Sequence, residues 1–430
     1  MMADNQAVAL SPCTTPGTVC TLGIDLGTTS VKAALVVGTE QGQLVTQSCS
    51  RETQAQADSP AAGAQGMEQD VQIIIEALNE CLVALPQEQL QRVSHIGISG
   101  QMHGVVFWKT NQGCKWTESG TGHTFQPEEV SHLITWQDGR CSSSFLSSLP
   151  QPQSHLSLAT GFGCATIYWY LKNSLRESGF PIHLLPEVGD PGGIAGRMSH
   201  DWHGIPTGTE VGIALGDFQC SVYSCMTERT DAVLNISTSA QLTIPMPLGF
   251  QPPETPDSLS AVAYFPYFDG NYLAVAASLN GGNVLATFVD MLACWMAELG
   301  HDVLESSVYT QMINAALAQN DTRLSICPTI FGERHMPERL ASVTRITASD
   351  LSLGHVTRAL CQGIIQNLHS MMPFQHLKEA GVKRILGSGS ALSKNEVLRQ
   401  EVEKMFPFPV IYGKDVDAAV GAAIVMLHRK

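Results

Sequence analysis

Apolar and polar positions alternate along the first part of the chain in short blocks that predict strands and helices. Apolar runs at 22–25 and 31–37 flank a Gly/Thr turn, which is typical of a strand, a tight turn and a second strand. The segment 40–66 is rich in Gln, Ser, Ala and Gly and predicts a loop. Across 71–85 the apolar residues recur at helical spacing until Pro86, so a helix is expected there.

The rest of the chain continues this alternation. Apolar spacing predicts a helix over 353–368, with Ser349 and Asp350 as candidate caps at its start. A second helix, over 417–427, consists of small residues that another backbone could approach closely. Four more short apolar runs predict strands that end in polar or glycine turns, at 95–99, 211–215, 232–236 and 384–386. Strands that alternate with helices in this way indicate an α/β fold with ligand groups at the strand ends.

Length and composition narrow the class of protein. A chain of 430 residues exceeds what one hydrophobic core usually serves, so two domains are expected. The net charge of −15 argues against nucleic acid or an anionic membrane as the main partner, because both need clustered Lys and Arg. An acidic protein can still bind a nucleotide if backbone N–H groups and bound Mg²⁺ form the site.

The cysteines and the N-terminal residues indicate a cytoplasmic protein. Twelve cysteines are scattered singly and none forms a C-x-x-C pair, so a zinc site has little support and free thiols are expected. Residues 1–20 lack the basic and apolar stretches of a signal peptide and predict a flexible leader. No stretch is apolar enough to span a bilayer.

The most specific motif is Gly-Ile-Asp-Leu-Gly-Thr-Thr-Ser at 23–30. A phosphate tail needs close backbone N–H donors, small residues and hydroxyl groups, which this turn supplies. Asp25 could hold Mg²⁺ directly or through water. The motif lacks the G-K-[ST] ending of a P-loop, and an ordinary hairpin turn is the alternative interpretation. The candidate nucleotide-binding residues in this motif and just after it are Asp25, Gly27, Thr28, Thr29, Ser30 and Lys32.

This motif resembles the first phosphate loop of the actin and sugar-kinase superfamily. Later motifs narrow the resemblance to the carbohydrate kinase family that includes xylulokinase and glycerol kinase. They follow the family's order at 99–104, 135–140, 215–219, 332–337, 387–391 and 417–423. The amino-acid sequence at 236–239, 279–283 and 387–390 most resembles the branch of the family that acts on sedoheptulose.

The resemblance implies a fold and a reaction. The fold would be two actin-like ATPase (ribonuclease H-like) domains, 21–229 and 230–430, around a central cleft. The reaction would be ATP- and Mg²⁺-dependent phosphorylation of a ketose, most closely sedoheptulose to sedoheptulose 7-phosphate. Another ketose or polyol kinase, such as one for xylulose, is the nearest alternative. An oxidoreductase is a poor alternative, because no G-x-G-x-x-G follows a strand and opens a helix.

The resemblance also assigns roles to residues. Asp217 would be the base that takes the proton of the sugar hydroxyl as it attacks the γ-phosphorus. From residue types alone, a helix N-cap is an equally good interpretation of Asp217. The implied sugar contacts are Gln101, Met102, His103, Trp136, Asp138, Arg140, Phe218 and Gln219. The implied nucleotide contacts in the second domain are Ser237, Thr238, Ser239, Gly281, Gly282, Gly387, Ser388, Gly389 and Ser390.

Plainer interpretations of these residues remain open. His103 could be a structural histidine, Arg140 could form a surface ion pair, and each glycine pair could be a simple turn. The family often has Gly-Thr-Ser-Gly where this chain has Ser-Thr-Ser-Ala at 237–240. Because the sedoheptulose branch shares that difference, it does not alter the assignment.

One departure from the family pattern concerns the segment between Asp138 and Asp217. After Asn173 the family continues with a further strand and helix, but this chain passes directly to Ser174. The shortfall is at least one strand–helix unit, roughly 30 residues or more. We therefore predict that a block is absent at this junction and that the first domain is incomplete, with exposed apolar surface. A protein that binds nucleotide without phosphorylating sugar is the corresponding functional alternative.

Overall fold

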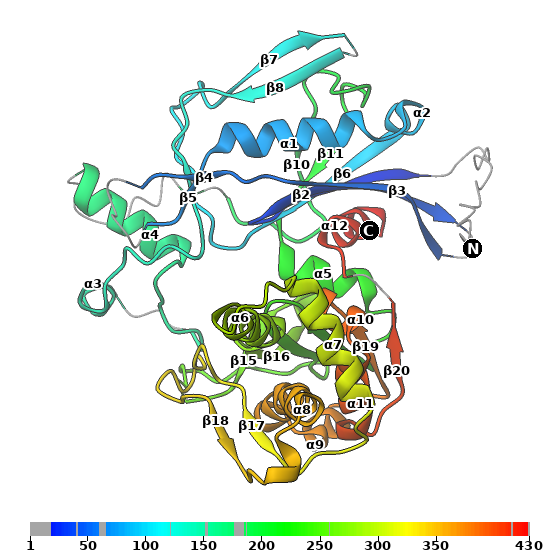
Figure 1. Cartoon of the computed structure of the whole chain (residues 1–430). Helices are drawn as coiled ribbons and strands as arrows, with labels where there is room; N and C mark the ends of the chain where they lie inside the picture. The colour runs from blue at the N-terminus through cyan, green and yellow to red at the C-terminus, as the bar shows by residue number, and fades with distance from the viewer. Residues whose placement is uncertain are drawn as a thin grey trace.

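The computed structural model describes residues 19–39, 42–59, 66–120, 122–150, 154–175, 185, 187–257, 259–413 and 416–428. Within these residues two large sheets lie one above the other, each packed against helices (Figure 1). The upper sheet comes from the first half of the chain and the lower sheet from the second half. The α/β fold predicted from the sequence is therefore confirmed.

The first sheet has the strand order β10-β11-β6-β1-β2-β3, and β12 also pairs with β6. Strands β1, β2 and β3 are antiparallel neighbours, whereas β6 is parallel to both β1 and β11. The strands are β1 (Cys20–Leu26), β2 (Ser30–Thr39), β3 (Gly42–Glu52), β6 (Val93–Gly100), β10 (Ile194–Arg197), β11 (Glu210–Gly212) and β12 (Leu215–Gly216).

The second sheet has the order β15-β16-β14-β13-β19-β20. Its strands β16-β14-β13-β19-β20 repeat the directions of β3-β2-β1-β6-β11, with an antiparallel group followed by a parallel group. The strands are β13 (Asp231–Ile236), β14 (Ala240–Pro245), β15 (Val262–Pro266), β16 (Tyr272–Ser278), β19 (Arg384–Ser388) and β20 (Val410–Tyr412).

Helices cover both faces of the first sheet. The residues of β1 show why each helix packs where it does. Leu22 and Ile24 point to α1 (Val71–Val83) and form one core with it. Gly23 points to α12 (Ala418–Leu427), where a Cβ atom would lie only 1.8 Å from the Ala419 carbonyl oxygen. The close approach predicted for the small-residue helix is therefore confirmed, and the end of the chain packs on the first sheet (Figure 1).

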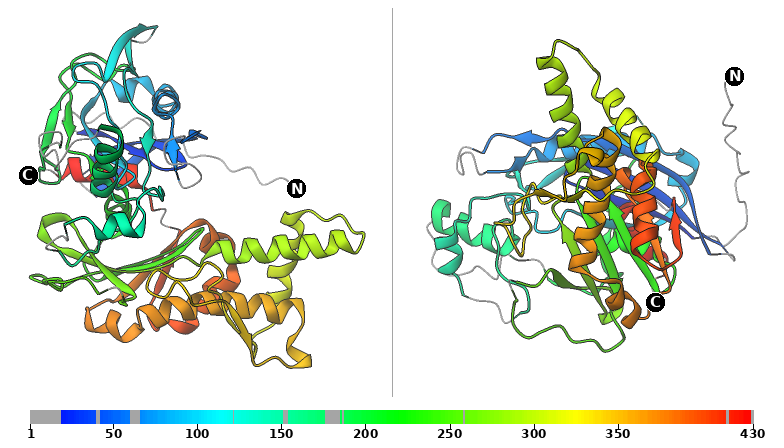
Figure 2. Two further views of the ribbon diagram at one scale, coloured as in Figure 1. Left: turned by 90° about the vertical axis from the view of Figure 1, so that its left-hand side faces the viewer. Right: turned by 60° about the horizontal axis from the view of Figure 1, so that its bottom comes forward.

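Helices of the second half surround the second sheet. The side of α8 that faces the sheet is buried almost throughout and supplies much of the larger core. Figure 2 shows that α6 and α7 extend outward from this half. These helices are α6 (Gly282–Glu298), α7 (Glu305–Leu317), α8 (Leu353–Met371), α9 (Phe374–Glu379), α10 (Ser390–Lys394) and α11 (Glu396–Met405). Helix α5 (Asp217–Cys225) precedes them and packs against both the second sheet and α12.

Smaller elements connect these layers. The short helices are α2 (Gln87–Leu90), α3 (Ser143–Ser147), α4 (Gly163–Tyr170), the π-helix η2 (Leu171–Leu175), η4 (Phe268–Gly270) and η5 (Ala348–Asp350). The short strands are β4 (Gln56–Ala57), β5 (Glu68–Gln69), β7 (Cys114–Ser119), β8 (Gly122–Pro127), β9 (Leu133–Ile134), β17 (Ser325–Cys327) and β18 (Ser342–Thr344). In the part of the chain that is described, no helix is long and apolar enough to cross a bilayer.

The structure corrects several local predictions. The loop expected at 40–66 contains β3, an edge strand whose mostly polar, exposed side chains hide its period. The cap of α8 is Ser352, whose hydroxyl accepts from the His355 N–H, and not Ser349 or Asp350. Residues 1–18 of the expected leader lie outside the described residues, and β1 already begins at Cys20.

The Asn173–Ser174 junction lies inside η2, the π-helical turn that follows α4. Residues 176–184 and 186, which follow it, lie outside the described residues. Leu185 and Val188 have exposed apolar side chains. The absence of a block remains a prediction.

Candidate active site

Two carboxylates predicted to act in the reaction lie at the same edge of the first sheet. Asp25 on β1 is in register with Ser99 on β6, which is in register with Leu215 on β12. Asp217 follows β12 directly. The Ser99 hydroxyl donates a 3.1 Å hydrogen bond to Asp25 Oδ1. The strand pairing thus brings Asp25 and Asp217 together from positions far apart in the sequence.

Burial and mutual repulsion define the electrostatics of this pair. Burial, and after it the charge of Asp217, raises the pKa of Asp25 to about 6 against the opposing effects of the Ser99 hydrogen bond and Lys32. Burial also raises the pKa of Asp217, opposed by backbone N–H groups that include that of Met102. The site therefore holds a buried Asp25 beside a half-buried Asp217, and the charge of Asp217 disfavours the ionised form of Asp25.

The N-cap interpretation of Asp217 is wrong, and its role as a base remains a prediction. It is the first residue of α5, the N-cap position being Gly216, and its Oδ1 accepts a 2.7 Å bond from the Phe218 N–H. A carboxylate in the first turn of a helix is stabilised by the helix dipole. Backbone N–H groups thus orient the carboxylate beside the turn after β6, a placement that is compatible with a base.

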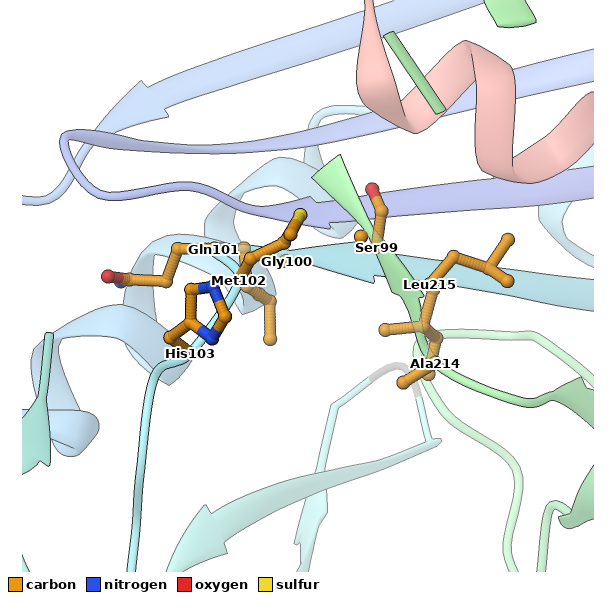
Figure 3. Close-up of a pocket in the computed structure, with 10 residues that line it drawn as sticks. Ser99, Gly100, Gln101, Met102, His103, Ala214 and Leu215 are labelled. Atoms are coloured by element: carbon orange, nitrogen blue, oxygen red, sulfur yellow. The ribbon is translucent and has the colours of Figure 1, made fainter. Parts of the chain in front are cut away.

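A cavity of about 410 Å³ lies next to Asp217. Gln101, Met102 and His103 line it from the turn after β6, and Ala214 and Leu215 lie across from them (Figure 3). Three of the predicted sugar contacts thus share one cavity. The lining comes from the first half of the chain, so the predicted cleft between the halves remains a prediction.

His103 has a structural contact as well as a place in this cavity. Its backbone has φ of 67°, and its ring stacks on Phe162 at 4.3 Å between centroids. Burial lowers the pKa of the imidazole, so the neutral form is favoured. A neutral imidazole presents one donor and one acceptor nitrogen, which suits hydroxyl recognition.

A chain of hydrogen bonds links the predicted sugar turn to the predicted phosphate turn. Gln101 Nε2 donates to Gln69 Oε1 at 3.1 Å, and Gln69 Nε2 donates to the Thr28 carbonyl at 2.6 Å. Trp136 Nε1 donates to Thr28 Oγ1 at 3.0 Å. Gln69, which the sequence analysis missed, is almost fully buried at the centre of this chain. Nothing in its local sequence marks it, since the link depends on the tertiary fold.

Asp138 and Arg140 form a buried ion-pair network. Arg140 Nε donates to Asp138 Oδ1 at 2.7 Å and Arg140 Nη2 donates to Glu68 Oε1 at 2.6 Å. Trp169 covers the guanidinium at 5.1 Å. The surface ion pair considered for Arg140 is wrong, since the pair is buried. Its Nη1 has no partner among the described residues, so a direct sugar contact remains a prediction.

Phe218 and Gln219 contact the second sheet. The Phe218 ring packs edge-on against Phe265 with 5.9 Å between centroids. Gln219 Nε2 donates to the Pro266 carbonyl at 3.3 Å. Both residues therefore help α5 join the two halves, and neither lines the 410 Å³ cavity. Their assignment as sugar contacts remains a prediction.

Three turns predicted to bind nucleotide converge in the second half. The Gly282 N–H donates to the Ser237 carbonyl at 2.7 Å, and the Ser390 N–H donates to the Ser237 hydroxyl at 3.2 Å. A Cβ atom on Gly282 would lie 2.5 Å from the Ser237 oxygen, and Gly389 has φ of 98°. Thr238 and Ser239 remain exposed. Close backbone packing thus explains these glycines and leaves hydroxyls available to a phosphate.

The sequence analysis also missed a third carboxylate. Asp417 caps α12 by accepting from the Ala419 and Val420 N–H groups at 2.9 and 3.1 Å. Its Oδ2 lies 3.9 Å from Lys32 Nζ, and its charge contributes to the raised pKa of Asp25. The packing of α12 on the first sheet places Asp417 near Asp25. Among the described residues, no group of three or more His, Cys, Asp or Glu could hold a metal alone.

Comparisons with known proteins place the chain in a family. Residues 20–172 match the N-terminal domain of the FGGY family of carbohydrate kinases. The chain is 60% identical to sedoheptulokinase of Mus musculus over 463 aligned positions, which cover 95% of this chain and 97% of that protein. It is 59% identical to sedoheptulokinase of Homo sapiens, with the same coverages.

The fold agrees with this match. The crystal structure of xylulose kinase from Rhodospirillum rubrum superposes with a TM-score of 0.71, covering 95% of this chain and 89% of that one. Because the two sequences are only 15% identical, this likeness shows the fold alone. Taken with the high identity to the mouse and human proteins, it leads to one conclusion: the chain belongs to the FGGY family of carbohydrate kinases.

Proposed function

We propose that the chain transfers the γ-phosphoryl group of ATP to sedoheptulose, giving ADP and sedoheptulose 7-phosphate, in the cytoplasm. The identity of 60% to a sedoheptulokinase supports the substrate. The observation that carries the reaction is the pairing of Asp25 and Asp217 at one sheet edge, beside a cavity lined by Gln101, Met102 and His103.

In this proposal Asp217 is the general base. A sugar hydroxyl is a weak nucleophile, so a carboxylate within hydrogen-bond reach must accept its proton as the oxygen attacks phosphorus. Burial raises the pKa of Asp217, which strengthens it as a base, while the Phe218 N–H holds one carboxylate oxygen and fixes its orientation. Gln101 and His103 would orient the sugar through hydrogen bonds.

The residues present fit an Mg²⁺-bound nucleotide. Two neighbouring carboxylates, one buried and one half-buried, favour a cation between or beside them, and Mg²⁺ commonly binds one or two carboxylates together with phosphate oxygens and water. Asp25 would hold the ion, directly or through water, and the ion would offset phosphate charge. The exposed hydroxyls of Thr29, Thr238 and Ser239 would receive the phosphate oxygens.

A second candidate function is nucleotide binding without phosphoryl transfer, since a block is predicted to be absent. The match to the family's N-terminal domain ends at residue 172, beside the Asn173–Ser174 junction. The alignment with the mouse protein spans 463 positions, whereas 95% of this 430-residue chain is about 409 residues. At least about 54 aligned positions therefore have no residue in this chain.

The test is sugar-dependent release of ADP by the purified chain, with sedoheptulose, xylulose and glycerol compared with and without Mg²⁺. We expect release with Mg²⁺ and with sedoheptulose above the other sugars. Faster ADP release with xylulose than with sedoheptulose would make xylulose the proposed substrate. Binding of ADP without release by any sugar would favour the second candidate, and absence of both would contradict the proposal.

A further inference from the structure

Glu333 is a fully buried carboxylate on the loop after β17, outside the cavity described above. Its exposed fraction is 0%, and burial of a carboxylate is costly unless hydrogen bonds replace the lost water. The motif that contains it matched the family pattern, but the proposed reaction gives it no task. A buried charge that the mechanism does not use calls for a physical explanation.

Four neutral donors surround this carboxylate. Its Oε1 accepts from Ser278 Oγ at 2.6 Å, Asn367 Nδ2 at 2.7 Å and Asn280 Nδ2 at 2.9 Å. Its Oε2 accepts from the Leu279 N–H at 3.2 Å. Three of these donors belong to consecutive residues at the end of β16, and the fourth comes from α8. The carboxylate therefore fastens the segment 278–280 to the core of the second half.

Asn280 extends this anchoring. It is completely buried, its Nδ2 also donates to the Gly332 carbonyl at 2.8 Å, and its Oδ1 accepts from the Phe331 N–H at 3.1 Å. Both ends of its amide are thus bound to the loop that carries Glu333. Asn280 directly precedes Gly281 and Gly282, so its position sets where α6 begins.

The start of α6 in turn contacts the hydroxyl-rich turn at 237–239. The Gly282 N–H donates to the Ser237 carbonyl at 2.7 Å, and the Asn283 N–H donates to the Thr238 carbonyl at 3.0 Å. A continuous path of hydrogen bonds and two peptide units therefore leads from Glu333 to the residues proposed to receive phosphate oxygens.

We propose that Glu333 is a positioning residue for nucleotide binding. Its carboxylate holds 278–280 in place, and this segment sets Gly281 and Gly282 against the 237–239 turn. The inference rests on the proposed function, because it assumes that this turn binds nucleotide. Glu333 itself is buried behind the turn and acts only through its neighbours.

The charge state of the side chain matters here because a carboxylate offers acceptors only. Glutamine has nearly the same shape, but its NH₂ group would face donors from Asn280, Asn367, Ser278 or Leu279. At least one of these four hydrogen bonds would be lost in E333Q, and the donor would be left without a partner. Aspartate keeps the acceptors but is one methylene shorter. In E333D the segment 278–280 would therefore shift toward the shorter side chain, and the 237–239 turn would shift with it.

The test compares E333Q with a matched control, E401Q, by calorimetric titration with ADP. Glu401 is also a buried glutamate of the second half, but its Oε1 accepts from Arg358 and Lys404. We expect E333Q to weaken ADP binding about tenfold or more and E333D to weaken it by an intermediate amount. E401Q should lower the melting temperature and leave ADP affinity within about twofold of the wild type.

The outcomes separate the two proposals. Wild-type affinity for ADP in folded E333Q would overturn the positioning role and leave the proposed function intact. An equal loss in E401Q would also overturn it, since general destabilisation would then explain the effect. Failure of the wild type to bind ADP would contradict the proposed function itself. If E333Q does not fold, E333D and Asn367→Ala, which removes a single donor from α8, decide the question in its place.

Discussion

The two halves of the molecule repeat one topology but carry different chemistry. In the first sheet β1 is antiparallel to β2 and parallel to β6, and in the second sheet β13 is likewise antiparallel to β14 and parallel to β19. Each first strand also has a polar residue one position before its last residue, Asp25 on β1 and Asn235 on β13. The repeated backbone thus places equivalent side chains, and their chemistry decides their roles.

The residue on β1 is an ionisable aspartate, whereas the equivalent residue on β13 is a neutral asparagine. Asp25 lies among Asp217, Asp417 and Lys32, whose charges shift its pKa. Asn235 accepts instead from the Ser237 hydroxyl at 3.4 Å, beside turns rich in glycine and serine. In the proposed function, the charged groups of the reaction therefore lie at the first sheet, and the turns of the second half hold the nucleotide through backbone and hydroxyl groups.

The largest effect is expected for Asp217→Asn in the first half. Loss of a general base lowers turnover by about 10²- to 10⁴-fold. Sugar-dependent ADP release by the purified variant measures this loss. Turnover within threefold of the wild type would remove Asp217 from the mechanism.

Asp25→Asn should stabilise the free protein while it impairs the reaction. Asp25 is almost fully buried and its pKa rises from 3.8 to about 6 on folding. The folded state therefore binds the proton more tightly, and its ionisation costs roughly 3 kcal/mol of stability as the pH rises through this range. At pH 8 the variant should unfold at higher urea concentration than the wild type.

The pH dependence supplies the control for this prediction. Near pH 4 both proteins carry an uncharged side chain at position 25, so their urea midpoints should converge. A difference that stays constant from pH 4 to pH 8 would show that Asp25 is not held as a perturbed acid. A lower Mg²⁺ requirement in the variant would count against its role in holding the ion.

Gly282→Ala should cause a smaller effect, confined to the second half. Its Cβ atom would lie 2.5 Å from the Ser237 carbonyl oxygen, and such overpacking costs about 1–3 kcal/mol. We expect ADP affinity to fall about tenfold. Gly196→Ala is the matched control, because a Cβ there meets nothing within 4 Å. An equal loss in both variants would contradict the role of the turn.

The local pattern of apolar and polar residues was sufficient to predict much of the fold. The runs at 22–25 and 31–37 predicted β1 and β2 because strands that are covered on both faces are buried almost throughout and leave a continuous apolar run. The edge strand β3 was missed because its polar side chains carry no such trace. The cap of α8 was misplaced because Ser349, Asp350 and Ser352 are all good capping residues, and only the backbone selects among them.

The site was predictable only where its residues lie in turns at strand ends. Asp25 lies near the end of β1, while Gln101 and Asp217 directly follow β6 and β12, and strand register brings these ends together. Gln69 and Glu68 act on the site from a two-residue strand, which no local pattern marks. Burial of Glu333 was equally hidden, since glutamate is usually exposed and its four donors come from two distant segments.

The account's central claim is that the two halves have different roles in the reaction. Its most direct test is the affinity for ADP, measured by calorimetry on Asp217→Asn and Gly282→Ala in parallel. The account predicts that Asp217→Asn binds ADP within about threefold of the wild type, whereas Gly282→Ala binds it about tenfold more weakly. The reverse order, with affinity lost in Asp217→Asn and kept in Gly282→Ala, would contradict it.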